Sequence, residues 1–201
     1  MIKLNIVSIE KKLNKRIRRN CISIGFDVAE RFTGICILKV TEKEIIIESL
    51  EKIETNPKDD SFHRADNFIN SLTKFQQEIS KYNEFKILTI EDCYFGMNPE
   101  TLKHLARFSI LVYRELKNSC NAWYLLLPMS ARSIIGFNQR KQEKLGNIKP
   151  HILTRGKNKG KEKKIACKDL VHDYLKTDFG VVIEDKDEAD AFVLSLAGIL
   201  K

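Results

Sequence analysis

The sequence lacks the residues and segments that mark secreted, zinc-stabilised or membrane proteins. Its cysteines, five in 201 residues, form no C-x-x-C pair and match no histidine spacing, so neither a disulfide framework nor a structural zinc site is expected. No apolar run is long enough to span a bilayer, and residues 1–20 lack the apolar core of a secretory signal.

These absences favour an intracellular protein without a membrane partner. The cytoplasm or nucleoid is the expected location, or a viral factory in an infected cell. The basic run at residues 11–19 leaves a mitochondrial location open, although Glu10 and the shortage of serine are untypical of a presequence.

What is present indicates one basic globular domain. The length fits a single domain with a real core, and a hydrophobic content of 43% is ordinary for one. The formal net charge of +8 points to a polyanionic partner such as nucleic acid. We expect a basic arm or short helix at residues 1–20, a domain at residues 21–201, and within it a basic loop at about residues 138–162.

The hydrophobic pattern predicts an α/β fold. Three β-rich runs joined by short connections predict an antiparallel meander at residues 21–27, 32–40 and 44–50. Further strands are expected at residues 85–90 and 122–127. Helical spacing is found at residues 61–82, 99–117, 130–136, 163–176 and 187–200. This order predicts a mixed five-stranded sheet, three antiparallel strands and then parallel ones, flanked by helices.

Four acidic residues stand where such a fold can bring them together. Asp27 ends the first of these strands, Glu91 follows the fourth, and Asp187 and Asp190 open the last helix one turn apart. Clustered carboxylates repel one another unless cations neutralise them, and oxygen ligands suit Mg²⁺ or Mn²⁺. Two such ions can drive phosphodiester hydrolysis, so these four residues are the candidate catalytic and metal-ligating set.

Each acid also has a simpler interpretation. Asp27 can end a strand in a turn, Glu91 can be an exposed strand-end residue, and Asp187 with Asp190 resembles a helix cap followed by a first-turn acid. The hypothesis of a site depends on all four occurring in this order on these elements.

The same residues resemble the RuvC-like Holliday junction resolvases of the RNase H superfamily. Residues 23–34 (SIGFDVAERFTG) are similar to the first-strand signature, although Val-Ala follows Asp27 where the family has Pro-Gly. Residues 88–95 (LTIEDCYF) resemble the strand bearing the catalytic Glu, residues 187–191 (DEADA) the closing helix, and residues 127–136 (LPMSARSIIG) the family's connector.

The resemblance implies a homodimeric nuclease that cuts four-way DNA junctions with two Mg²⁺ or Mn²⁺ ions per site. The helix at residues 99–117 would supply much of the dimer contact. Tyr94 and Phe95 stand where the family carries an aromatic that touches junction bases, and core packing is an equally good interpretation of both. The remaining candidate nucleic-acid contacts are basic: Arg132, Lys149, Arg155, Lys157, Lys159, Lys163 and Lys164, of which the last two lie near the family's phosphate-binding lysine.

Three other functions compete with a junction resolvase. An RNase H-like nuclease acting on RNA or an RNA–DNA hybrid would carry the same acids. A non-catalytic nucleic-acid-binding module of the same fold would gain nothing from acids clustered beside phosphates. The actin-like ATPases also begin with a strand that ends in Asp, but they need a second domain and glycine-rich loops that this chain lacks.

Overall fold

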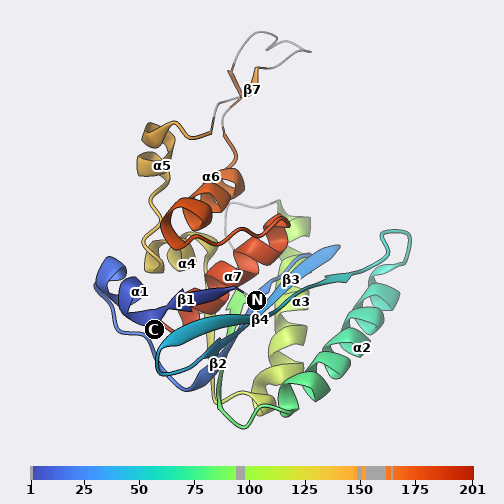
Figure 1. Cartoon of the computed structure of the whole chain (residues 1–201). Helices are drawn as coiled ribbons and strands as arrows, with labels where there is room; N and C mark the ends of the chain where they lie inside the picture. Colours follow the sequence, from blue (N-terminus) through green and yellow to red (C-terminus); the bar gives the residue numbers. More distant parts are fainter. Residues whose placement is uncertain (1, 94–97, 149–150, 153–161, 164) are drawn as a thin grey trace.

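The computed structural model describes residues 2–93, 98–148, 151–152, 162–163 and 165–201. Within them, the main sheet has six strands in the order β1-β4-β3-β2-β5-β6 (Figure 1). Strands β2, β3 and β4 form the antiparallel meander, while β5 pairs parallel to both β2 and β6. The expected mixed sheet is confirmed. Its strands are β1 (Lys3–Asn5), β2 (Cys21–Asp27), β3 (Phe32–Val40), β4 (Glu44–Glu54), β5 (Phe85–Glu91) and β6 (Ala122–Leu126).

Helices cover both faces of this sheet (Figure 1). On one face, α2 (Ser61–Ser80) and α3 (Pro99–Leu116) bury aromatic and aliphatic side chains against β2 and β5. On the other face lie α1 (Ile6–Leu13), α4 (Pro128–Ile134), α6 (Cys167–Tyr174) and α7 (Lys186–Gly198). Short helical turns follow α3 at Lys117–Ser119 and α6 at Leu175–Phe179. None of the helices in the described ranges is long and apolar enough to cross a membrane.

The segment before Cys21 contains a short helix, one of the two alternatives expected for it, but it packs as part of the domain and does not precede it as a separate arm. It contributes the edge strand β1, which pairs with β4, and the helix α1, capped by Asn5. Leu4, Ile6, Ile9 and Ile17 are all buried in the core. The sheet therefore has one strand more than predicted, because apolar residues spaced among the basic ones pack against the domain.

The predicted basic loop at residues 138–162 contains regular structure. Helix α5 (Gln139–Leu145) begins at the cap residue Asn138 and ends at Gly146. Two short strands, β7 (His151–Ile152) and β8 (Glu162–Lys163), pair with each other beyond α6. The other residues between 149 and 161 lie outside the described part of the chain.

Helix α7 packs unusually close to the sheet because two strand positions opposite it are glycines. A Cβ atom on Gly25 would overlap the backbone oxygen of Ala191, and one on Gly34 would overlap that of Asp187. Two serine hydroxyls stabilise the contact between α7 and the sheet. Ser23 Oγ donates to the Ser195 carbonyl at 2.7 Å, and Ser195 Oγ donates to the Cys36 carbonyl at 2.9 Å. The start of α7 is thereby held over β2 and β3.

Replacing Gly34 by Ala should lower the free energy of unfolding by at least about 2 kcal/mol, because the added methyl group would push α7 off the sheet. Gly146→Ala is the matched control. No atom lies within 4 Å of a Cβ there, so only the backbone strain of its positive φ is added, about 1 kcal/mol. Urea denaturation measures both. Equal losses would show that the close approach of α7 is unimportant for stability.

Candidate active site

Asp27 and Glu91 leave neighbouring parallel strands side by side. Phe26 on β2 lies in register with Ile90 on β5, so the next residue of each strand emerges at the same edge of the sheet. The residue just before each acid is apolar and buried, and each strand ends at its acid. The Asp27 side chain is buried and shares a hydrogen bond with the Glu91 carboxyl.

Helix α7 brings two further acids to this edge. Its cap residue Asp185 accepts hydrogen bonds from the backbone N–H groups of Asp187 and Glu188, which fixes where the helix begins. Lys52 on β4 forms an ion pair with the same cap. Asp187 and Asp190 then lie one turn apart, and their carboxylates meet that of Asp27 around a common lysine ammonium.

That ammonium belongs to Lys168, in the first turn of α6. Its Nζ lies 3.2 Å from Asp27, 2.9 Å from Asp187 and 3.0 Å from Asp190. Over the described residues, no three acidic, histidine or cysteine side chains surround a point that a metal ion would occupy as they stand. The cation among these carboxylates is the lysine.

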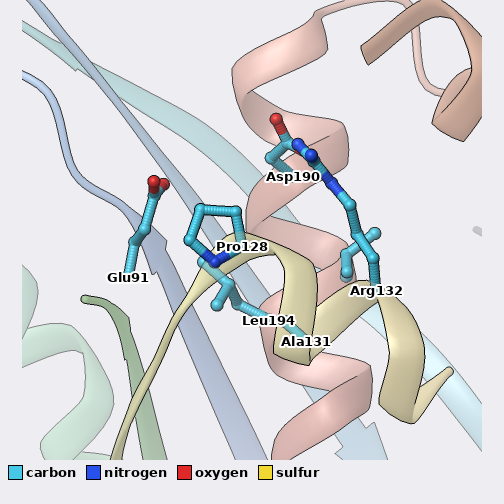
Figure 2. A pocket seen from close by; sticks show the side chains of 7 residues that line it. Glu91, Pro128, Ala131, Arg132, Asp190 and Leu194 are labelled. Atoms are coloured by element: carbon cyan, nitrogen blue, oxygen red, sulfur yellow. The ribbon is translucent and has the colours of Figure 1, made fainter. Parts of the chain in front are cut away.

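A second basic residue holds Asp190 from the other side. Arg132, on α4, donates to the Asp190 carboxylate at 3.0 Å and to Cys167 Sγ at 3.3 Å. Figure 2 shows its side chain reaching from α4 to Asp190 on α7, with Glu91 across Pro128. These residues line a cavity of about 10 Å³, roughly the space of one water molecule.

The acids perturb each other's protonation. Burial raises the pKa of Asp27, although its hydrogen bond with Glu91 and the charge of Lys168 oppose this. Burial, followed by the hydrogen bond and charge of Asp27, raises the pKa of Glu91 to about 10. Burial alone would lower the pKa of Lys168, but Asp27 and Asp190 raise it above the ordinary value. These shifts favour a protonated Glu91 and a charged Lys168 at neutral pH.

The structure brings Asp27, Glu91, Asp187 and Asp190 together at one edge of the sheet, and places the predicted DNA contact Arg132 among them. Arg132 is largely buried, its side chain only 12% exposed, and it forms an ion pair with Asp190. Lys163 lies in β8. The other predicted contacts lie outside the described residues: Tyr94, Phe95, Lys149, Arg155, Lys157, Lys159 and Lys164.

Lys168 contacts the acids but is not among the residues that the sequence predicts for the site. The resemblance points to Lys163 and Lys164, ahead of a helix, whereas Lys168 lies within α6, which begins at Cys167. The available signal was indirect. A buried acidic cluster requires a cation, and the first turn of the helix preceding the closing helix is one place to supply it.

Comparisons with known proteins bear on the fold. No model of a protein family matches the chain, and comparison with curated protein sequences finds no relative. Among solved structures, the chain resembles Thermus thermophilus RuvC in complex with a Holliday junction substrate, with a TM-score of 0.58 and 12% identity over 88% of this chain and 91% of that one. It also resembles a second RuvC structure from that organism, with a TM-score of 0.59 and 13% identity over 88% and 92%.

A third similar structure is the yeast mitochondrial Holliday junction resolvase Ydc2, with a TM-score of 0.50 and 13% identity over 95% of this chain and 82% of that one. The chain has the RuvC-like fold. At these identities the likeness establishes the architecture alone.

Proposed function

We propose that the chain is a divalent-metal-dependent endonuclease that cuts branched DNA, with four-way junctions as its substrate. The observation that carries this proposal is the convergence of Asp27, Glu91, Asp187 and Asp190 at one edge of the sheet in a protein of net charge +8. Gathering four carboxylates in one place costs folding stability unless cations neutralise their charges. A basic surface around them favours a phosphate-bearing substrate.

The donor set fits a hard divalent cation. All four side chains offer oxygen only, which Mg²⁺ and Mn²⁺ prefer. Asp27, Glu91 and Asp190 would form the centre of a metal site, with Asp187 at its more exposed side. When bound, two such ions supply an activated water and neutralise charge at the phosphate.

The residues of the chain have roles beyond ligation. Arg132 fixes the orientation of Asp190 through its ion pair at 3.0 Å. Lys168, which is 39% exposed, can contact a phosphate oxygen at the mouth of the site. Asp185 and Lys52 fix the start of α7, and so the position of Asp187.

We further propose that the domain acts as a homodimer, joined through the α3 and β6 side. Strand β6 is the outer strand of the main sheet and has no described partner on its free side. Apolar side chains beside it face solvent: Ile110 on α3 is 63% exposed, and Trp123 and Leu125 are each 48% exposed. Exposed apolar groups gathered in this way favour contact with a second protein surface.

Leu125→Glu should weaken dimerisation at least about tenfold, because a charge would be buried at the centre of that contact. Leu125 is preferred to Trp123, whose ring packs against Tyr113 within the chain. Sedimentation velocity over a range of concentrations measures the effect. Val182→Glu, at a site 61% exposed on another part of the surface, is the control and should leave dimerisation unchanged. If both variants dimerise as the wild type does, the interface lies elsewhere.

The proposed function is tested with labelled four-way junction, linear duplex, single strand and RNA–DNA hybrid, each with Mg²⁺, Mn²⁺ or EDTA. Cleavage of the junction above all others, abolished by EDTA, is the expected result. Preferential cleavage of the hybrid would keep the metal site but replace the substrate. Tight junction binding with no cleavage in either metal would overturn the enzyme and favour a binding module.

A further inference from the structure

The group with the most acidic partners in the site is a cation belonging to the chain itself. Lys168 Nζ contacts one oxygen each of Asp27, Asp187 and Asp190, at 2.9–3.2 Å. These acids come from β2 and from two successive turns of α7, so the ammonium bridges two elements far apart in sequence. It occupies the position from which a bound cation would neutralise all three acids.

We propose that Lys168 is a tethered counter-ion of the metal-free site, and that a divalent cation enters by displacing its ammonium from these three acids. This inference rests on the proposed metal-dependent function. In this proposal the chain itself carries, in Lys168, a competitor for the metal.

The oxygens that hold the ammonium are the ones a cation would need. Lys168 contacts Asp27 Oδ2, Asp187 Oδ1 and Asp190 Oδ2. Arg132 uses the other oxygen of Asp190, Oδ1. Displacement of the lysine therefore frees one oxygen of each of these three acids without breaking the Arg132 pair. Carboxylate oxygens suit a hard cation, and the three side chains would draw closer together around it, since as they stand in the described part of the chain they enclose no metal position.

The two basic residues differ in how readily they can leave. Arg132 is only 12% exposed and is held at two points, by Asp190 and by Cys167. Lys168 is 39% exposed, and Asp187 beside it is 30% exposed, so the lysine can swing outward on its flexible stem. Arg132 is thus a fixed support for Asp190, whereas Lys168 is exchangeable.

The test measures binding of Mg²⁺ and of Ca²⁺ alone by isothermal titration calorimetry, using protein first stripped with EDTA. Lys168→Met removes the ammonium but keeps a side chain of similar length, and it should bind each cation about tenfold more tightly than wild type. Lys39→Met is the matched control. Lys39 pairs with Glu84 at 3.0 Å, and its cation affinity should stay at the wild-type level. An unchanged or weaker affinity in Lys168→Met would overturn the inference.

A second measurement keeps the inference testable if Lys168→Met folds poorly. In wild type, acylation of each lysine by a soluble reagent is followed by mass spectrometry, in EDTA and in saturating Ca²⁺. Lys168 should react several-fold faster with Ca²⁺ bound, since its ammonium then leaves the carboxylates, while Lys39 keeps one rate. Equal rates for Lys168 in the two conditions would contradict displacement.

Failure of this inference can be told apart from failure of the proposed function. A chain that binds neither cation, with or without Lys168, contradicts the metal site and the inference together. A chain that binds cations with the same affinity in wild type and Lys168→Met contradicts the displacement alone.

Discussion

Glu91→Gln should abolish junction cleavage, by at least about 10³-fold, while leaving the fold and junction binding intact. The reason lies in the protonation of this residue. Without metal, Glu91 is a neutral carboxylic acid hydrogen-bonded to Asp27, because its pKa is raised to about 10. A glutamine amide has nearly the same shape and also donates to Asp27. It lacks only the negative charge that a cation would use.

Asp190→Asn should lose as much activity but should also destabilise the protein. Its carboxylate is the partner of two basic residues, Arg132 and Lys168, and removing it leaves the buried Arg132 unpaired. Cleavage rates under single-turnover conditions, junction affinity and urea denaturation separate the effects. The exposed Asp66→Asn on α2 provides the same chemical change away from the site and should alter none of them.

Activity within tenfold of wild type in Glu91→Gln would remove Glu91 from the mechanism.

The metal-free protein should become less stable as the pH rises from about 6 to 9. Folded Glu91, with its pKa at about 10, keeps a proton that unfolded Glu91, at its ordinary value of 4.5, has already lost. The folded state therefore binds one more proton between these two pKa values. The stability that Glu91 contributes is fully present below pH 4.5 and is lost as the pH rises through about 10. One full proton corresponds to a loss of about 1.4 kcal/mol per pH unit.

The neighbouring titratable groups, Asp27 and Lys168, do not reverse this loss of stability with rising pH. The pKa of Asp27 is also raised, chiefly by burial, so its contribution to stability has the same sign as that of Glu91. The raised pKa of Lys168 has no slope in this window, since the lysine is charged in both states until the pH passes its ordinary value of 10.5. Urea denaturation in EDTA at several pH values tests the prediction, with Glu91→Gln as the control. An equally steep fall in that variant would assign the proton to another group.

The placement of the four acids at one end of the strands can be predicted from the sequence because it depends on local pattern. Asp27 and Glu91 each end a run of apolar β-forming residues, and the alternation of strands with helices makes those two strands parallel. The closing helix is apolar on all sides, which is typical of a buried helix, and Asp187 and Asp190 stand in its first turns.

The positions of Lys168, Arg132 and the N-terminal segment depend on tertiary packing, which cannot be predicted from local sequence pattern. Lys168 reaches the acids only because α6 packs against α7, and Arg132 turns inward because Asp190 and Cys167 are there to accept its hydrogen bonds. The apolar residues of α1 are spaced among lysines and read as a charged arm. Only the contact with the sheet shows that Ile6 and Ile9 belong to the core.

The order of the acids along the chain bears on protein synthesis. Everything up to the end of β6 contains Asp27 and Glu91 but neither acid of α7, and Lys168 also comes later. A growing chain that has reached the end of β6 therefore holds only two of the four carboxylates. The group of acids is completed only in a late step, when α7 has been synthesised and docks on β2 and β3.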